Sequence, residues 1–304
     1  MKLSVVTTLY FSEEYIEEFC DKVSKNIPEE FNKYEIILVD DGSPDKSLET
    51  ALTVKLSNEN IKIIELSRNF GHHKAIMAGL SNADGDYIFL IDIDLEEPLE
   101  CVNELWSMIK LNKLDCCYGV QKSRKGKFGE KFFGNIFYKT LNAISDIKYP
   151  VNTLTARIMS REYVQALLYY KEKSLDIWGV FLLNGFKQSS IEIIKKSKGS
   201  TTYTFTKKIS IAFEIITSLT SSPLVYIFYI GLIVFLLSLI FILTIILKAI
   251  FQDMSAVLGW ASIIASIWFI GGLIILLLGI LSIYVSKIFV EVKNRPLFTI
   301  KKIY

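Results

Sequence analysis

The chain has 304 residues, a formal net charge of +2 and a mean hydropathy of +0.36. Its small net charge, with no basic run interleaved with aromatic residues, argues against a nucleic-acid partner. No charged residue occurs from Ile215 to Leu247 or from Met254 to Ser286, and each stretch exceeds the roughly 20 residues that a helix needs to cross a bilayer. We therefore expect a globular N-terminal part followed by a membrane-embedded part.

The N-terminal part alternates strand-like with helix-like segments. Its strand-like runs are LSVVTTLY, YEIILVD, IKIIELS and DYIFLID. Such alternation is typical of a mostly parallel sheet that is covered by helices on both faces. Met1 and Lys2 lead directly into the first strand without the segments of a signal peptide, so we expect this part to stay in the cytoplasm.

Two of the expected strands end in acidic residues. One runs into Asp40 and Asp41, and another into Asp92 and Asp94. Because parallel sheets bind ligands at the carboxyl ends of their strands, we expect both pairs on one rim. Carboxylates two residues apart can share a cation once the strand has stopped, and such oxygen ligands suit Mg²⁺ or Mn²⁺ together with a nucleotide diphosphate.

The stretch FLIDIDLEEP also permits a purely structural interpretation. Asp94, Glu96 and Glu97 lie just before Pro98, where a helix is expected to begin. Acidic side chains stabilise the positive end of a helix and cap its amide groups. Taken alone, the stretch does not decide between a metal site and a helix cap.

Other polar residues of the globular part have several interpretations. His72 and His73 lie on an expected loop, where packing or solvation is more typical than donor binding. Lys195, Lys196 and Lys198 form either a solvated face or a contact for anionic lipid headgroups.

The membrane-embedded part is expected to span residues 223–288. Two helices at about 224–247 and 259–285 are separated by a short turn, which predicts a transmembrane hairpin with both ends on one side. Residues 206–222 are expected to lie along the membrane interface.

The distribution of basic residues sets the expected orientation. The lysines and arginines that flank the hairpin are Lys207, Lys208, Lys287, Lys293, Arg295, Lys301 and Lys302, whereas the turn carries Lys248 alone. By the positive-inside rule, the domain of residues 1–205 and the tail of residues 289–304 are cytoplasmic. We therefore expect a multi-pass membrane protein whose globular domain and tail both lie in the cytoplasm.

Several motifs together resemble a known enzyme family. VDDGSPDKS, SRNFGHHKA and GDYIFLIDIDLEEP, in that order, resemble the nucleotide-sugar-binding half of family 2 glycosyltransferases with a GT-A fold. The chain is more closely similar to the polyprenyl-phosphate branch, which includes dolichol-phosphate mannose synthases and bactoprenol glucosyltransferases. GILSIYVSKIFVEVKNRPLF resembles that branch's second span and tail, so the resemblance covers nearly the whole chain. It implies an α/β GT-A domain followed by a two-helix transmembrane hairpin.

The resemblance also implies roles for residues of the donor site. Asp41 matches a nucleobase contact, and Tyr10 lines the same pocket. Asp92 and Asp94 match the family's DxD motif, in which the second acid holds the metal and the first lies against the ribose or phosphate. Glu96 stands where the family usually has glutamine, and we expect it to be a second metal ligand.

Two arginines complete the implied catalytic set. Arg124 falls where the family places an arginine near the acceptor phosphate, and Arg157 matches the arginine of its DFR segment. Thr155 stands where that segment has aspartate, which leaves the role of the aspartate vacant or moved. Further departures from the family's pattern affect how the donor and the acceptor are bound. These residues are Thr7, Thr8, Phe11, Ser12, Thr201 and Thr202.

The implied reaction is attack by polyprenyl phosphate, undecaprenyl phosphate in bacteria, on the anomeric carbon of a nucleotide sugar. A UDP-sugar is the expected donor, Mg²⁺ or Mn²⁺ the expected cofactor, and a polyprenyl-phosphate monosaccharide for surface-glycan assembly or modification the product, formed with inversion. The alternatives are a transferase that extends a lipid-linked oligosaccharide or uses another lipid acceptor, and a catalytically weak membrane scaffold. The sugar, the nucleotide base and the formation of a homo-oligomer stay open.

Overall fold

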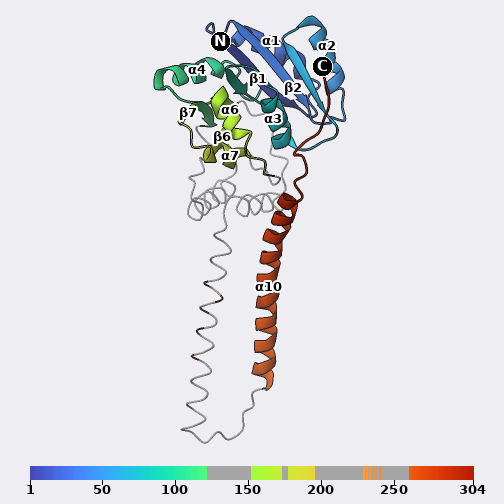
Figure 1. Cartoon of the computed structure of the whole chain (residues 1–304), viewed down its shortest axis with the longest axis vertical. Coiled ribbons are helices and arrows are strands. Elements are labelled where there is room, and N and C mark those ends of the chain that lie inside the picture. Colours follow the sequence, from blue (N-terminus) through green and yellow to red (C-terminus); the bar gives the residue numbers. More distant parts are fainter. Residues whose placement is uncertain are drawn as a thin grey trace, which may run out of the picture.

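The computed structural model describes residues 1–121, 152–172, 177–195 and 260–304, together with single positions between 229 and 240. Figure 1 shows a sheet domain that contains both chain termini, and one long helix that projects away from it. The predicted segment of residues 206–222 and most of the first predicted span lie outside the described residues.

The described residues form seven helices and eight strands. The strands are β1 (Lys2–Leu9), β2 (Lys33–Asp40), β3 (Ile61–Leu66), β4 (Tyr87–Leu90), β5 (Cys116–Gln121), β6 (Thr153–Ser160), β7 (Gln188–Ile193) and β8 (Ile300–Ile303). The helices are α1 (Ile16–Asn26), α2 (Ser47–Ser57), α3 (His72–Ser81), α4 (Cys101–Asn112), α6 (Arg161–Leu167), α7 (Ile177–Leu183) and α10 (Trp260–Val292).

The strands form one mostly parallel sheet in the order β7-β5-β6-β4-β1-β2-β3-β8. β1 pairs in parallel with β2 and β4, β2 with β3, and β5 with β7. β6 lies antiparallel between β4 and β5, and β8 lies antiparallel to β3. The carboxyl ends of β1 to β5 and of β7 therefore share one rim, which confirms the predicted mostly parallel α/β domain.

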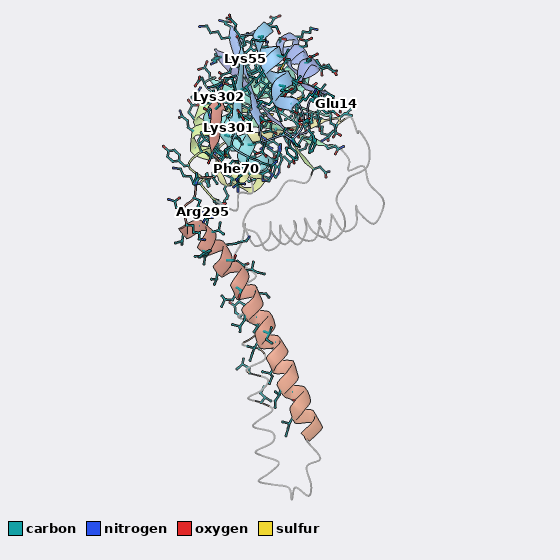
Figure 2. All side chains as sticks on the ribbon, turned by 90° about the vertical axis from the view of Figure 1, so that its right-hand side faces the viewer. Glu14, Lys55, Phe70, Arg295, Lys301 and Lys302 are labelled. Carbon is teal, nitrogen blue, oxygen red and sulfur yellow. The ribbon has the colours of Figure 1, made fainter. Side chains whose placement is uncertain are left out.

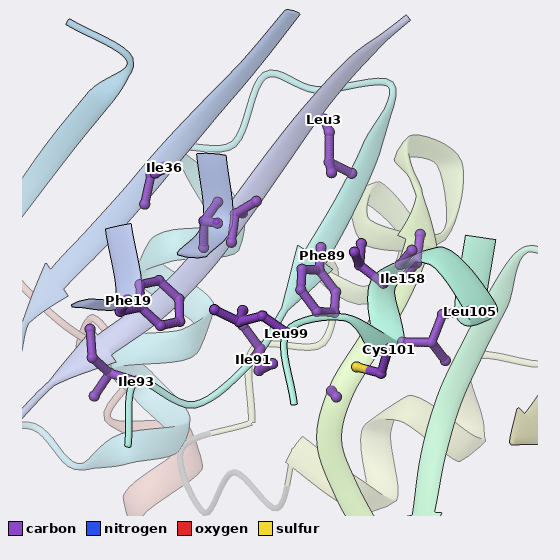
Figure 3. Close-up of a cluster of buried hydrophobic side chains, with 14 of the residues drawn as sticks. Leu3, Phe19, Ile36, Phe89, Ile91, Ile93, Leu99, Cys101, Leu105 and Ile158 are labelled. Atoms are coloured by element: carbon purple, nitrogen blue, oxygen red, sulfur yellow. The ribbon is translucent and has the colours of Figure 1, made fainter. Parts of the chain in front are cut away.

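Helices cover both faces of the sheet, as the continuous apolar runs of the central strands require. One core includes Phe19 of α1, Phe89 of β4 and Leu105 of α4 (Figure 3). The other includes Ile76 of α3 and Tyr163 of α6 on the opposite face. The two cores fix the strand ends, and the strand ends position the candidate site.

The C-terminal residues return to the sheet. The sequence predicted a cytoplasmic tail at residues 289–304 without assigning it a structure, whereas Ile300–Ile303 forms the edge strand beside β3. Lys301 forms an ion pair with Glu65, and the hydroxyl of Tyr304 donates to Glu65 at 2.9 Å. Figure 2 shows Lys301 and Lys302 at the sheet and Arg295 at the domain end of α10.

Helix α10 contains the second predicted span. Within the described part of the chain, Leu273–Val292 is the one helical segment long and apolar enough to cross a membrane, with a hydropathy of 2.5. The helix extends to Val292, beyond the predicted limit of residue 285. The predicted hairpin stays a prediction, because only single helical positions of its first span are described.

Candidate active site

The loops that leave β1, β2 and β3 are tied to one another at the rim. The amide of Phe11 donates to Ser43 Oγ at 2.8 Å, which joins the first loop to the second. Gly42 has a φ of +63°, and a Cβ there would lie 2.7 Å from the carbonyl carbon of Arg68. Only glycine therefore permits this approach of the second loop to the third.

Asp41 joins the second loop to the third through hydrogen bonds. Its two carboxylate oxygens accept from the amides of Phe70 at 2.7 Å and Gly71 at 2.9 Å. Burial raises the pKa of Asp41 although these amides oppose the shift. In this arrangement the side chain shapes the loop before α3, and its predicted nucleobase contact stays a prediction.

Tyr10 lies at the same rim with an accessible ring. Its side chain is 49% exposed, and its ring meets that of Phe11 edge to face, with 4.8 Å between the ring centroids. Phe11 adopts a left-handed backbone conformation with a φ of 52°. The end of β1 thus presents two aromatic side chains to solvent.

Asp92 lies between two side chains from other elements. Thr155 Oγ1 donates to its Oδ2 at 2.8 Å, and His72 Nε2 lies 3.6 Å from its Oδ1. His72 Nδ1 is in turn 3.0 Å from Thr8 Oγ1. The sequence predicted a packing or solvation role for His72 and no function for Thr155. The structure instead places both against the first acid of the DxD motif.

Asp94 and Glu96 form a local turn that Lys195 joins from the end of β7. The amide of Glu96 donates to Asp94 Oδ1 at 3.0 Å, and Lys195 Nζ lies 2.9 Å from Glu96 Oε2. Burial raises the pKa of Asp94, as does the negative charge of Asp92. Burial is the largest influence on the pKa of Lys195 and lowers it, but the hydrogen bond to Glu96 and the negative charges of the neighbouring acids together leave the pKa raised.

These contacts correct the interpretation of the lysine cluster. Lys195 belongs to the acidic rim, not to a solvated face or a lipid contact, because its ammonium group pairs with Glu96 and only 26% of its side chain is exposed. Lys196 and Lys198 lie outside the described residues. The sequence carried no local signal for this pair, since its members are far apart in the chain.

Glu97 is buried and fixes the start of β6. Its carboxylate accepts from the amides of Thr155 at 3.1 Å and Ala156 at 2.7 Å. Burial, with a contribution from the charge of Asp92, raises the pKa of Glu97 to about 7. The helix-cap interpretation of Glu97 is wrong, because α4 begins only at Cys101.

Of the two predicted catalytic arginines, the structure describes only Arg157. Arg124 lies outside the described residues. Arg157 is 2% exposed, and its guanidinium donates to the carbonyl groups of Leu154 and Thr155. Its Cζ lies 3.8 Å from the ring centroid of Phe181, and burial lowers its pKa. Arg157 thus supports the beginning of β6 through these carbonyl groups and packs against Phe181 of α7. Its predicted catalytic role stays a prediction.

The acidic residues at the rim fit a metal ion whose coordination shell is completed by a bound ligand. Among the described residues, no three His, Cys, Asp or Glu side chains converge to hold a metal ion. Mg²⁺ commonly binds through one or two carboxylates together with waters and substrate phosphates, so a full protein cage is not required. Asp94 and Glu96 are the two carboxylates expected in this role, and the negative charge of Asp92 lies near Asp94. Their assignment as metal ligands stays a prediction.

The rim lies on the side of the domain from which α10 extends. In Figure 2, Phe70 of the rim lies toward Arg295 at the start of the tail, whereas Lys55 lies at the far end of the domain. Because β1 to β4 are parallel, the acidic residues that follow β2 and β4 lie at the same end of the sheet as Phe70, nearer to the apolar helix.

A sequence model of glycosyl transferase family 2 matches residues 4–168, more than half of the chain. The chain belongs to this family. A protein of Mycobacterium tuberculosis assigned as a glycosyltransferase is 40% identical over 100% of this chain and 89% of its own length. The homologues include bactoprenol glucosyl transferases, which confirms the resemblance to the polyprenyl-phosphate branch. The homologue encoded by a prophage of Escherichia coli is 32% identical over 100% of this chain and 99% of its own length.

A solved structure agrees on the fold of this glycosyltransferase. Glucosyl-3-phosphoglycerate synthase from Mycobacterium tuberculosis, in complex with phosphoglyceric acid, superposes with a TM-score of 0.51 over 73% of this chain and 79% of its own. The identity is 16%, so this likeness supports the GT-A-like fold alone.

Proposed function

We propose that this glycosyltransferase transfers a sugar from a nucleotide-sugar donor to polyprenyl phosphate, with inversion, and forms a polyprenyl-phosphate monosaccharide. The observation that carries the proposal is the acidic rim of Asp92, Asp94 and Glu96 on the side of the domain from which α10 extends. The names of its bactoprenol glucosyl transferase homologues support a polyprenyl-phosphate acceptor. The product would serve surface-glycan assembly or modification.

The donor is assigned to the rim by its polar and aromatic groups. Tyr10 offers an exposed ring for the nucleobase, and Asp41 keeps the neighbouring loop in place beside it. Asp92, fixed by His72 and Thr155, is proposed to accept from the ribose or to lie against the phosphates. A UDP-sugar is the proposed donor.

Asp94 and Glu96 are proposed to hold Mg²⁺ or Mn²⁺. The ion would supply positive charge to the departing diphosphate. Asp94 is fixed by the amide of Glu96, and Glu96 is held toward β7 by Lys195. In this proposal the two carboxylates bind the ion beside the diphosphate at the carboxyl ends of the strands.

The acceptor phosphate is already an anion at neutral pH, so its attack needs no strong general base. The protein must instead position the two substrates and stabilise the leaving group. Arg124 is proposed to bind the acceptor phosphate. We assign Arg157 to positioning, because its buried guanidinium supports the strand segment that carries Thr155.

The proposed location is the bacterial inner membrane, with the sheet domain in the cytoplasm. Leu273–Val292 is proposed as one of two spans, paired with residues 224–247 in a hairpin. The bilayer then presents the acceptor headgroup near the rim.

The test is a transfer assay on membranes that contain the full-length protein, undecaprenyl phosphate, Mg²⁺ or Mn²⁺, and a panel of labelled nucleotide sugars. We expect one donor to give a labelled lipid that mild acid cleaves, and Asp94→Ala to abolish its formation. Labelling of a lipid-linked oligosaccharide would assign the alternative acceptor. No labelled lipid from any donor, with intact protein present, would reject the proposed function.

A further inference from the structure

Lys195 reaches the acidic rim because of the sheet topology. β7 runs parallel to β5, and β5 and β4 both run antiparallel to β6. The carboxyl end of β7 therefore lies on the same rim as the carboxyl end of β4. Lys195 follows β7 by two residues, and Asp94 and Glu96 follow β4.

The ammonium group of Lys195 lies where several negative charges gather. It is 2.9 Å from Glu96 Oε2, and the side chains of the two residues are only 26% and 21% exposed. The charges of Glu97 and Asp94 also favour the protonated lysine. At this depth such charges interact more strongly than an exposed surface pair, because water screens them less.

In this arrangement, Lys195 and a divalent ion would compete for the carboxylate of Glu96. Glu96 is a proposed ligand of the divalent ion, and one of its oxygens is already paired with Lys195. An ion at Asp94 and Glu96 would approach a fixed positive charge, and this repulsion costs free energy at short range. A diphosphate adds negative charge to the same position and reduces that cost.

We propose that Lys195 is a positioning residue that competes with the divalent cation for Glu96, so that the cation binds weakly until the nucleotide diphosphate arrives. This inference rests on the proposed function. It makes the metal and the donor bind cooperatively. It also assigns a role to Lys195, for which the resemblance implied none.

The test measures Mn²⁺ binding to the purified full-length protein without nucleotide, from the electron paramagnetic resonance signal of free Mn²⁺. We expect Lys195→Met to raise the affinity for Mn²⁺ roughly fivefold, because the competing charge is removed. Lys195→Arg, which keeps the charge, is expected to bind Mn²⁺ like the wild type. Lys187→Met is the matched control, since Lys187 precedes β7 at the opposite end of that strand and its ammonium donates to the carbonyl of Asn112.

A double-mutant cycle separates competition for Glu96 from a general charge effect. In the Glu96→Gln background, Lys195→Met is expected to change the affinity by less than about twofold, because the shared carboxylate is gone. A fivefold gain that persists in this background would overturn the inference. So would an unchanged or weakened affinity in a Lys195→Met protein that melts like the wild type.

The same measurement distinguishes failure of the inference from failure of the proposed function. Binding of Mn²⁺ that depends on Asp94 but does not respond to Lys195→Met refutes the competition alone. If UDP is present and no variant shows binding that depends on Asp94, the proposed metal role fails, and the inference fails with it.

Discussion

Asp92 is held by side chains that come from two other elements. His72 approaches one of its oxygens from the start of α3, and Thr155 donates to the other from β6. Thr155 stands where the resemblance implied an aspartate, and its hydroxyl donates a hydrogen bond to Asp92. His72 and Thr155 thus fix the first acid of the motif from two sides.

At the same scale, Asp40 makes stability depend on pH. Burial, reinforced by the negative charge of Glu65, raises the pKa of this 2% exposed carboxyl group to about 6. The unfolded chain has a carboxyl pKa of about 3.9, so the folded protein keeps a proton that the unfolded chain releases between these values. The unfolding free energy therefore falls as the pH rises from about 4 to about 6.

We expect Asp40→Asn to remove this dependence while it keeps the oxygen that accepts from the amide of Ser43. Between pH 4 and pH 7, the wild type should lose about 2 kcal/mol of stability relative to the variant. Denaturant unfolding of both proteins across this range measures the difference. A difference that does not change with pH would contradict the assignment.

The residue patterns revealed only part of the candidate site. Asp92 and Asp94 were recognisable because they follow an apolar strand at a spacing of two. The roles of His72, Thr155 and Lys195 were not, because each depends on a partner at least 20 residues away in the chain. Local periodicity carries no information about such contacts.

At the scale of the elements, the strands β1 to β4 were predictable because their apolar runs are continuous and bounded by polar loops. β8 was not, because the segment Ile300–Ile303 is short and carries two lysines. Charged residues of this kind are typical of edge strands, whose place is set by a neighbouring strand. In this fold that neighbour is β3, and its Glu65 is satisfied by Lys301 and Tyr304.

We expect removal of residues 299–304 to destabilise the sheet domain. The truncation exposes the edge of β3. It also leaves Glu65, which is 7% exposed in the intact protein, without its partners from the tail. The apparent melting temperature in detergent should fall by roughly 5–10 °C, with increased aggregation on size-exclusion chromatography.

The matched control for this truncation is Lys302→Ala, which removes an exposed contact with the ring of Tyr304 but keeps the strand. It should lower the melting temperature by less than about 2 °C. If the truncated protein melts like this control, β8 does not stabilise the domain.

At the scale of the whole molecule, the tail limits how far the sheet domain can lie from α10. The helix ends at Val292, and β8 begins at Ile300. Eight residue steps can span at most about 29 Å. With α10 in the bilayer, as we propose, the domain stays close to the membrane surface, and its rim lies on the side of α10 (Figure 2). The sequence predicted the apolar helix but not this second attachment, because the attachment depends on the pairing of β8 with β3.

We propose that the acidic rim performs sugar transfer to polyprenyl phosphate. The most direct test is the rate at which purified full-length protein, in vesicles with undecaprenyl phosphate and its donor, forms the labelled lipid, measured for the wild type and for Asp94→Asn. We predict a loss of at least about 100-fold, because the variant keeps the shape of the side chain but loses its charge. Asp84→Asn changes an exposed acid that precedes β4, at the opposite end of the strands, and should keep the wild-type rate. An Asp94→Asn protein that transfers sugar within about twofold of the wild-type rate would contradict the account.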